Sequence, residues 1–406
     1  MFRTLDDLPS DRRLLCRLDL NSPVEDGVVQ DNKRFERHAK TVGELVDAGH
    51  RIAILAHQGR PNRPSFLSLE QHADILASHL DSPIQFVDDV YGERALSAID
   101  SLDSGEVLVL ENVRSVPEEL EDHTPEEHAN CPLVRILSAH VDAYVNDAYS
   151  TAHRAHASTV GFPVVLDAYA GRVMESEYLA NSAIQSRTFD GPVTMVLGGI
   201  KVEDLIAVLT KVEDRVDTVC LGGVIAELFL RDAGHDLGYD VGSSDLFDDQ
   251  WETNRELIAS IRERAAVDLC MPIDLAYRGN GDRQEISVDG ISKTTPFYDV
   301  GTQTVDQYGS VIKESAAVFV KGALGKFEDE AFSYGTVELL RTIAETDAFS
   351  VIGGGDTAWA IDRYGLDESA FSHVSIAGGA YVRALAGERL PAIDALQAAT
   401  DQSDNH

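Results

Sequence analysis

Short apolar runs alternate along the whole chain with segments of helical periodicity, and this alternation limits the fold more than any other feature. In the first half the runs lie at 12–21, 51–61, 83–90, 106–114 and 143–150. In the second half they lie at 193–201, 216–223, 268–275, 316–325, 349–357 and 373–381. Continuous apolar runs are typical of strands buried on both faces of a parallel sheet. The pattern therefore predicts an α/β fold with two Rossmann-like, doubly wound parallel-sheet domains.

The length of 406 residues also predicts two domains, because one hydrophobic core rarely grows that large. We expect residues 1–167 to form the first domain and residues 191–390 the second. Residues 168–190 are predicted to be the hinge, with one helix from Ala168 to Gln185 and then a loop. Residues 391–406 form a tail with a short helix. The Gly- and Thr-rich segment 276–300 is expected to be a hairpin or excursion from the second sheet.

The charge excludes several kinds of partner. The chain has 69 Asp and Glu against 34 Lys and Arg, a net charge of −35, and only eight lysines. Such a surface repels nucleic acid and anionic membranes, and no stretch is apolar enough to span a bilayer. An acidic surface with little lysine favours the cytoplasm of a halophile, where concentrated salt screens the repulsion, over an ordinary acidic protein. The four cysteines form no CxxC pair, so neither disulfides nor a zinc site is predicted.

Polar side chains follow the apolar runs of the first half, where ligands bind in open parallel sheets. They are Asp19, Asn21, His57, Arg60, Arg114, His153, Arg154 and His156, and Arg34 joins them if its loop folds back over the sheet edge. Arginines that converge on so acidic a protein indicate a small anionic ligand, because arginine binds carboxylate and phosphate through two donors. The alternative for any single arginine is a salt bridge to one of the many carboxylates.

Glycine turns end three strands of the second half, at Gly198-Gly199, Gly353-Gly354-Gly355 and Gly378-Gly379. Glycine lets a backbone approach a phosphate, and a helix that begins there directs free N–H groups at it. Lys201 can reach the same phosphate. Asp356 and Thr357 can cap the next helix, and Asp356 can alternatively face a magnesium ion. These features predict a nucleotide site, although glycine turns can also be simple tight loops.

The GGGDTA segment offers a competing interpretation, since it loosely fits the dinucleotide pattern of a dehydrogenase. However, no acidic residue ends the next apolar run, where a ribose-binding carboxylate is expected. The chain also lacks the G-x-x-x-x-G-K-[ST] sequence of P-loop enzymes.

Taken in order, the motifs resemble those of the phosphoglycerate kinases, especially the archaeal and haloarchaeal branch. The segments that carry the resemblance are RLDLNSPVEDG, DNKRFERHAKT, LAHQGRP, VLENVR, VNDAYSTAHRAHASTVG, AGRVMESE, VLGGIKVED, GALGKFE, VIGGGDTAWA and FSHVSIAGGA. Together they cover nearly the whole chain.

The resemblance implies a cytoplasmic, monomeric enzyme of glycolysis and gluconeogenesis that moves a phosphoryl group reversibly between 1,3-bisphosphoglycerate with ADP and 3-phosphoglycerate with ATP. It implies that the domains close around the hinge and that a carboxylate is the nucleophile, so no general base is needed. The implied site for 3-phosphoglycerate consists of Asp19, Leu20, Asn21, Arg34, His57, Gln58, Gly59, Arg60, Arg114 and Arg154.

The implied site for the magnesium nucleotide consists of Lys201, Glu328, Gly354, Gly355, Asp356 and Thr357, with Asp356 at the metal. The implied catalytic groups are Arg34, Lys201, Gly354 and Gly355, which would cancel charge on the transferring group.

The sequence departs from the family pattern in three places. Leu205 stands where many members have a second lysine. The usual Asn-Gly-Pro turn reads Lys321-Gly322-Ala323, with Lys326 at a commonly apolar position, and the last glycine loop reads 375–379, SIAGG. We hypothesise that Lys321 or Lys326 restores the cation lost at Leu205. The departures also leave open a nucleotide-binding regulator without turnover, in which the arginines would have no use.

Overall fold

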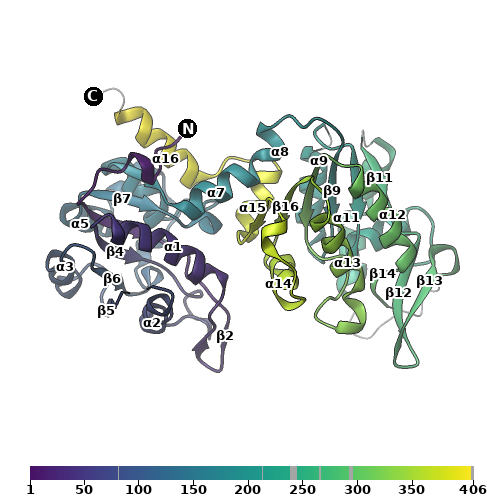
Figure 1. Ribbon diagram of the computed structural model, residues 1–406, viewed down its shortest axis with the longest axis horizontal. Helices are drawn as coiled ribbons and strands as arrows, with labels where there is room; N and C mark the ends of the chain where they lie inside the picture. The colour runs from purple at the N-terminus through teal and green to yellow at the C-terminus, as the bar shows by residue number, and fades with distance from the viewer. Residues whose placement is uncertain (81, 213, 238–244, 265–266, 292–295, 404–406) are drawn as a thin grey trace. The chain divides into compact units, whose positions relative to one another are not determined.

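The computed structural model describes residues 1–406 except 81, 213, 238–244, 265–266, 292–295 and 404–406. The chain divides into two compact units (Figure 1). The first unit combines Met1–Leu179 with Arg389–His406, and the second is Ala180–Glu388. Each unit is built on its own six-stranded sheet of parallel neighbours, so the predicted fold class is confirmed.

The sheet of the first unit has the order β5-β6-β4-β1-β7-β8. Its strands are β1 (Arg13–Arg17), β4 (Arg51–Leu55), β5 (Ile84–Val87), β6 (Val107–Leu110), β7 (Ala143–Asn146) and β8 (Ala168–Ala170), and the short strands β2 (Val24–Glu25) and β3 (Val28–Val29) pair separately. The helices are α1 (Lys33–Asp47), α2 (Glu70–Ser78), α3 (Glu93–Asp100), α4 (Pro125–Ala129), α5 (Pro132–Leu137), α6 (Phe162–Val165) and α16 (Pro391–Ser403), with α7 (Arg172–Asn181) at the unit boundary. Single helical turns are η1 (Leu5–Asp7), η2 (Val113–Ser115), η3 (Pro117–Glu119), η4 (Ser138–His140), η5 (Tyr149–Thr151) and η6 (Ala157–Gly161).

Alternate residues of these strands face opposite sides of the sheet, and both sides are covered. On one side Cys16 and Ile54 pack with Phe35 of α1 in one buried cluster. On the other side Tyr144 stacks on Phe162, with ring centroids 5.3 Å apart. Burial on both sides explains why the strands read as continuous apolar runs.

The predicted single helix from Ala168 to Gln185 is wrong. Ala168–Ala170 forms the edge strand β8, and the helical residues that follow divide into α7 and α8 (Ala183–Ser186). The reason lies in Asp147, whose Oδ1 accepts hydrogen bonds from the N–H groups of Val173 at 2.8 Å and Met174 at 3.1 Å. This carboxylate caps the amino end of α7 and so fixes where the helix begins.

The tail helix α16 packs on the first unit, although its sequence lies at the opposite end of the chain (Figure 1). The N–H of Ala392 donates to the carbonyl of Ala152 at 3.1 Å. The N–H of Arg3 donates to the hydroxyl of Thr400 at 3.2 Å. The helix predicted for the tail is confirmed, and these bonds identify its docking surface.

The sheet of the second unit has the order β11-β10-β9-β15-β16-β17. Its strands are β9 (Val193–Leu197), β10 (Thr218–Leu221), β11 (Asp268–Cys270), β15 (Ala317–Lys321), β16 (Phe349–Gly353) and β17 (His373–Ser375). The helices are α9 (Val202–Val212), α10 (Gly223–Asp232), α11 (Asp245–Arg264), α12 (Thr302–Lys313), α13 (Tyr334–Ala344), α14 (Gly355–Arg363) and α15 (Gly378–Leu385), with the turns η7 (Val288–Gly290), η8 (Glu330–Phe332) and η9 (Glu368–Ala370).

The hairpin predicted for the Gly- and Thr-rich segment is confirmed, and it belongs to a separate antiparallel sheet with the order β13-β12-β14. Its strands are β12 (Asp274–Gly279), β13 (Asp282–Ser287) and β14 (Phe297–Val300). Asn280 and Gly281 connect β12 to β13 with φ values of +54° and +95°. A two-residue turn with both φ values positive matches the twist of paired strands and favours the Asn-Gly sequence.

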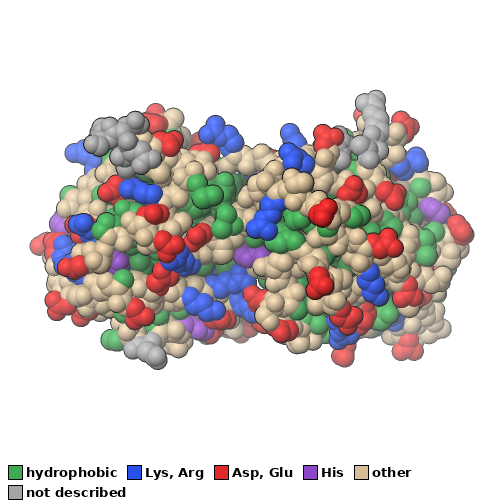
Figure 2. Space-filling view, turned by 45° about the horizontal axis from the view of Figure 1, so that its top comes forward, with side chains coloured by type: hydrophobic (Ala, Val, Ile, Leu, Met, Phe, Trp, Pro, Cys, Tyr) green, Lys and Arg blue, Asp and Glu red, His purple; other side chains and the backbone are tan. Residues whose placement is uncertain are grey.

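Acidic side chains are spread over the visible face of both units (Figure 2). None of the described helices combines the length and the apolar character needed to cross a membrane.

Candidate active site

In the first unit, the segments after β1 and β7 and the start of α1 bring several predicted residues together. Arg34 pairs through Nη1 with Asp19 Oδ2, and the hydroxyl of Ser150 donates to the same oxygen. His57 Nδ1 lies 3.9 Å from Asp19 Oδ1. Asn32 caps α1 by accepting the N–H of Arg34 at 2.9 Å, which fixes the start of the helix. Arg34 therefore reaches back to the sheet edge. This is the condition under which the sequence predicts that Arg34 joins the site.

Amide groups tie the loop after β1 to the loop after β4. Asn21 Oδ1 accepts the N–H of Gly59 at 2.8 Å, and Gln58 Oε1 accepts the N–H of Ser22 at 2.9 Å. The side chains of Leu20 and Gln58 are buried and hold the two loops together. Gly59 has a φ of +65°, and a Cβ there would collide with the backbone of the 65–66 segment, so the turn requires glycine.

The remaining predicted arginines lie in the same region. Arg114 is almost completely buried and donates from Nη1 to the carbonyl of Gly59. Arg154 donates from Nε to His153 Nε2 at 3.1 Å. Arg60 is exposed, and its guanidinium has no hydrogen-bond or ion-pair partner among the residues that the structure describes. An exposed guanidinium beside a buried one leaves donors available for a ligand.

Burial and neighbouring guanidiniums keep the histidines of this region neutral. Burial, followed by Arg17 and Arg114, holds the pKa of His57 well below its usual value. Burial and the same two arginines lower the pKa of His156 to about 3. At pH 7 neither His57 nor His156 carries charge, and the arginines around them supply positive potential.

We call the five guanidiniums that influence one another here the arginine cluster: Arg17, Arg34, Arg60, Arg114 and Arg154. Burial first, and then the neighbouring Arg17, Arg154 and Arg60, lower the pKa of Arg114 to about 10. Asp19 and Glu119 contact members of the cluster or the histidines beside them, and the carboxylate of Glu177 also acts on the charge of Arg34. Five guanidiniums are thus close enough to influence one another, an arrangement that suits a small anionic ligand.

The sequence did not single out Arg17, which lies in β1, or Glu119, which lies in η3. Arg17 and Glu119 are completely buried and approach to 4.0 Å. Ser158 joins them, accepting from Arg17 Nε at 2.8 Å and donating to Glu119 Oε1 at 2.8 Å. Arg17 Nη2 also lies 3.1 Å from His57 Nδ1. The available signal in the sequence concerns Arg17, which is a charged residue inside an apolar run.

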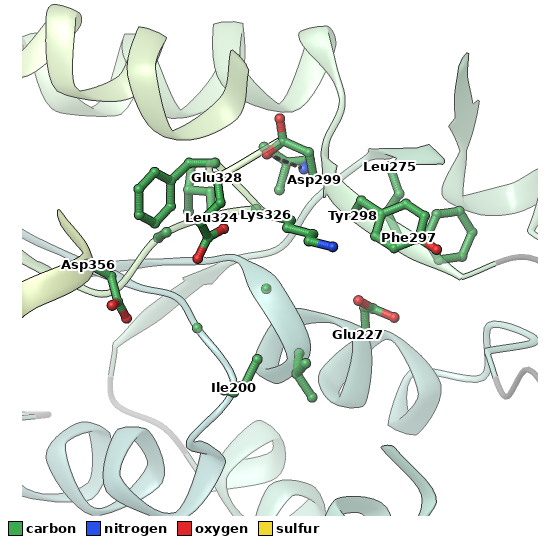
Figure 3. Close-up of a pocket in the computed structure, with 17 residues that line it drawn as sticks. Ile200, Glu227, Leu275, Phe297, Tyr298, Asp299, Leu324, Lys326, Glu328 and Asp356 are labelled. Carbon is green, nitrogen blue, oxygen red and sulfur yellow. Dashed lines mark hydrogen bonds between the residues drawn. The ribbon is translucent and has the colours of Figure 1, made fainter. Parts of the chain in front are cut away.

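In the second unit, a cavity of about 310 Å³ opens where several strands of the sheet end (Figure 3). Asp356 and Glu328 lie at one side of it, and Leu275, Phe297 and Tyr298 lie at the other. Asp356 and Glu328 thus border one end, while the aromatic side chains of Phe297 and Tyr298 border the other, where the carboxylate of Glu227 also lies. The antiparallel sheet, to which the sequence assigned no chemistry, supplies the aromatic wall.

The glycine triplet at the start of α14 directly precedes Asp356, which lines the cavity. Gly354 stands at the N-cap with a φ of +109°, which strongly favours glycine. The expectation that Asp356 or Thr357 caps this helix is wrong. The hydroxyl of Thr357 instead donates to the carbonyl of Gly353 at 3.1 Å, within the first turn. The amino end of α14 therefore has no side-chain cap and keeps N–H groups for an anion.

Of the other nucleotide-site candidates, Glu328 lines the same cavity, and Lys201 directly follows Ile200, which lines it. Lys201 is exposed at the start of α9, and Glu328 is exposed at the cavity wall. Leu205 is 2 % exposed, so its side chain belongs to the core of the unit. Lys326 Nζ lies 5.9 Å from the ring centroid of Tyr298, toward the aromatic end.

A magnesium ion bound with a nucleotide takes most of its ligands from phosphates and water, so it needs few protein groups. Among the described residues no group of three or more histidine, cysteine or acidic side chains is arranged to hold a metal. Asp356 is an exposed carboxylate that lines the cavity, which fits a metal held mainly by its nucleotide.

Comparison with known proteins gives one consistent result. The family model described as phosphoglycerate kinase matches residues 5–388. A phosphoglycerate kinase of Halorubrum lacusprofundi is 61% identical, covering 98% of each chain, and one of Haloarcula marismortui is 56% identical, covering 98% of this chain and 99% of its own. The crystal structure of the phosphoglycerate kinase from Pyrococcus horikoshii matches with a TM-score of 0.91 at 33% identity, covering 99% of this chain and 100% of its own.

These relatives overturn the dehydrogenase interpretation of the glycine triplet, and they overturn that of a regulator without turnover. The chain belongs to the phosphoglycerate kinase family, in its haloarchaeal type, and is an enzyme that transfers phosphoryl groups reversibly in glycolysis.

Proposed function

We propose that the first unit binds 3-phosphoglycerate through the arginine cluster and that the second unit binds ADP or ATP in its cavity. The observation that carries the first assignment is the convergence of five guanidiniums, some buried and one exposed, in one region of the first unit. A ligand with a phosphate and a carboxylate offers these guanidiniums negative charge at two points. Asp19, Asn21 and His57 then border the ligand, and Gly59 shapes the loop between them.

The cavity suits a nucleotide because its two ends differ. Apolar and aromatic side chains such as Tyr298 suit a base, and Glu328 is placed to accept hydrogen bonds from ribose hydroxyls. The uncapped N–H groups at Gly354 and Gly355 suit phosphate oxygens. Bound magnesium supplies neutralising charge across the phosphates, and Asp356 is the residue that would hold it.

The proposed chemistry is an in-line transfer between the carboxylate of 3-phosphoglycerate and the γ-phosphoryl group. A carboxylate is already ionised at neutral pH, so the reaction needs no general base. This agrees with His57 and His156, whose lowered pKa values keep them neutral and poor proton acceptors at pH 7. Arg34, Lys201 and the N–H groups of Gly354 and Gly355 are proposed to stabilise charge on the transferring group.

Because one substrate is assigned to each unit, the two units must come together during the reaction, which also excludes water from the acyl phosphate. We further propose that the enzyme works as a monomer in the cytoplasm of a salt-adapted cell. The net charge of −35 with only eight lysines supports adaptation to salt.

Isothermal titration calorimetry in concentrated KCl tests the assignment of the substrate site. We expect Arg114→Ala to weaken 3-phosphoglycerate binding by about tenfold or more, since a charge-assisted hydrogen bond typically stabilises by about 1.5–3 kcal/mol. Binding of MgADP should not change. The matched control is Arg135→Ala, because Arg135 is an exposed arginine on α5, outside the cluster. Unchanged 3-phosphoglycerate binding in Arg114→Ala would contradict the assignment.

A further inference from the structure

Lys321 lies between the two glycine turns that follow β9 and β16. It is the last residue of β15, the strand that lies between β9 and β16. In the register of the sheet it pairs with Leu197, which precedes the first turn, and with Gly353, which begins the second. Its side chain is directed at the second turn, because a Cβ built on Gly354 would lie 3.4 Å from Lys321 Nζ. The ammonium group therefore sits beside the uncapped amino end of α14.

The surroundings of this ammonium group are electrostatically unfavourable without a ligand. Lys321 is half-buried, and among the described residues its ammonium makes no hydrogen bond or ion pair. Burial lowers its pKa, Lys201 lowers it further, and Asp356 and Asp204 oppose the shift. The amino end of a helix carries a partial positive charge. Two lysines and a helix amino end thus converge on one place, and the neighbouring carboxylates are not in contact with Lys321.

We infer that Lys321 binds the phosphate chain of the nucleotide and supplies, with Lys201, the second cation of the phosphate site. This inference rests on the proposed nucleotide site and assigns a residue within it. A phosphate bound there would accept from Lys321 and from the N–H groups of α14 at the same time. It would also provide the counter-charge that the protein does not.

Lys326, the other lysine of this loop, is in a different position. Its ammonium lies over Tyr298 at the aromatic end of the cavity, on the side away from Asp356 (Figure 3). Its N–H donates to the carbonyl of Tyr298 at 2.6 Å, which ties the loop to β14. Of the two candidates for the cation missing at Leu205, Lys321 is therefore the one that borders the phosphate end.

Calorimetry with ligands that differ only in phosphate content tests this role. In Lys321→Met we expect binding of MgATP and MgADP to weaken by about tenfold to a hundredfold, and binding of adenosine to change by less than about twofold. Lys321→Arg should recover most of the affinity because it restores the charge. Lys313→Ala, which removes an exposed lysine at the end of α12, is the matched control.

A second readout separates ligand binding from a structural role. Methionine fills a similar volume without a desolvated charge, so unliganded Lys321→Met should melt at the same or a higher temperature than the wild type. A lower melting temperature together with an equal loss of adenosine binding would show that Lys321 has a structural role, and this result would overturn the inference. Unchanged binding of MgATP and MgADP in Lys321→Met would also overturn it. Failure of the wild type to bind any nucleotide would instead refute the proposed site itself.

Discussion

Replacing Arg17 by methionine should destabilise the first unit strongly, because it leaves Glu119 buried without its counter-charge. Both side chains are completely inaccessible to solvent, and the two charged groups approach to 4.0 Å. Removing one partner of a buried ion pair typically costs about 3–5 kcal/mol. The variant also loses the bonds of Arg17 to Ser158 and His57, so the upper part of this range is expected.

The loss of stability caused by Arg17→Met should depend on pH, and the direction of this dependence follows from the pKa of Glu119. Burial already raises the pKa of Glu119, while Arg17 lowers it. Without Arg17 the folded-state pKa rises further above the unfolded value, so the folded unit binds a proton more tightly than the unfolded chain does. The destabilisation is then smallest at low pH and grows as pH rises through the folded pKa. Arg17→Met/Glu119→Gln removes the buried charge and should recover part of the lost stability.

Hydrogen–deuterium exchange of peptides from β1 and β7 is the suitable assay. Both tryptophans, Trp251 and Trp359, lie in the second unit, so their fluorescence reports that unit and serves as an internal control. A loss of about 3 kcal/mol lowers protection of amides that open globally by more than about a hundredfold. Arg13→Met, on the same strand but at a half-buried position, should change protection little. A loss below about 1 kcal/mol that does not vary with pH would refute the reasoning.

Three further predictions concern other sites. His72 has a pKa lowered to about 4 by burial, so the free energy of unfolding should fall by roughly 2 kcal/mol between pH 6.5 and 5, a slope that His72→Asn should remove in urea titrations. Gly354→Ala should weaken MgADP binding by about tenfold or more in calorimetry, with 3-phosphoglycerate binding unchanged, because φ is +109° there. Asp147→Asn should cost about 2 kcal/mol in urea unfolding, since Asp147 caps α7 and bonds His38 Nδ1 at 2.8 Å. Unchanged stability, affinity or slope in these variants would contradict the respective assignment.

The strands could be predicted because a strand that is buried on both faces of a sheet has a continuous run of apolar residues in the sequence. Each of the eleven apolar runs contains a strand of one of the two large sheets. One strand of the first sheet, β8, lies outside these runs. It has only three residues, and the helical periodicity of the α7 residues that follow it extends over it in the sequence. Where α7 begins depends on the carboxylate of Asp147, which is distant in sequence and becomes a cap only in the folded unit.

The residues of the candidate site could be predicted from the sequence, but the buried residues that hold them in place could be predicted only in part. Arg34, Arg114 and His57 follow apolar runs or open a helix, and the topology of a parallel sheet brings such positions together. Glu119 lies in a polar loop with many other carboxylates, and nothing local distinguishes it. Lys321 and Lys326 are five residues apart, and only the direction of each side chain separates their roles.

The most direct test of the two-site account is turnover of 3-phosphoglycerate with MgATP in concentrated KCl, with 1,3-bisphosphoglycerate trapped by a coupled dehydrogenase. Wild type, Arg34→Ala and Lys201→Ala should be measured together, with Arg135→Ala as the control. The account predicts turnover in the wild type and in the control, and a loss of about a hundredfold or more in kcat for the other two variants. Full turnover in Arg34→Ala or Lys201→Ala, or none in folded wild type that still binds nucleotide, would contradict it.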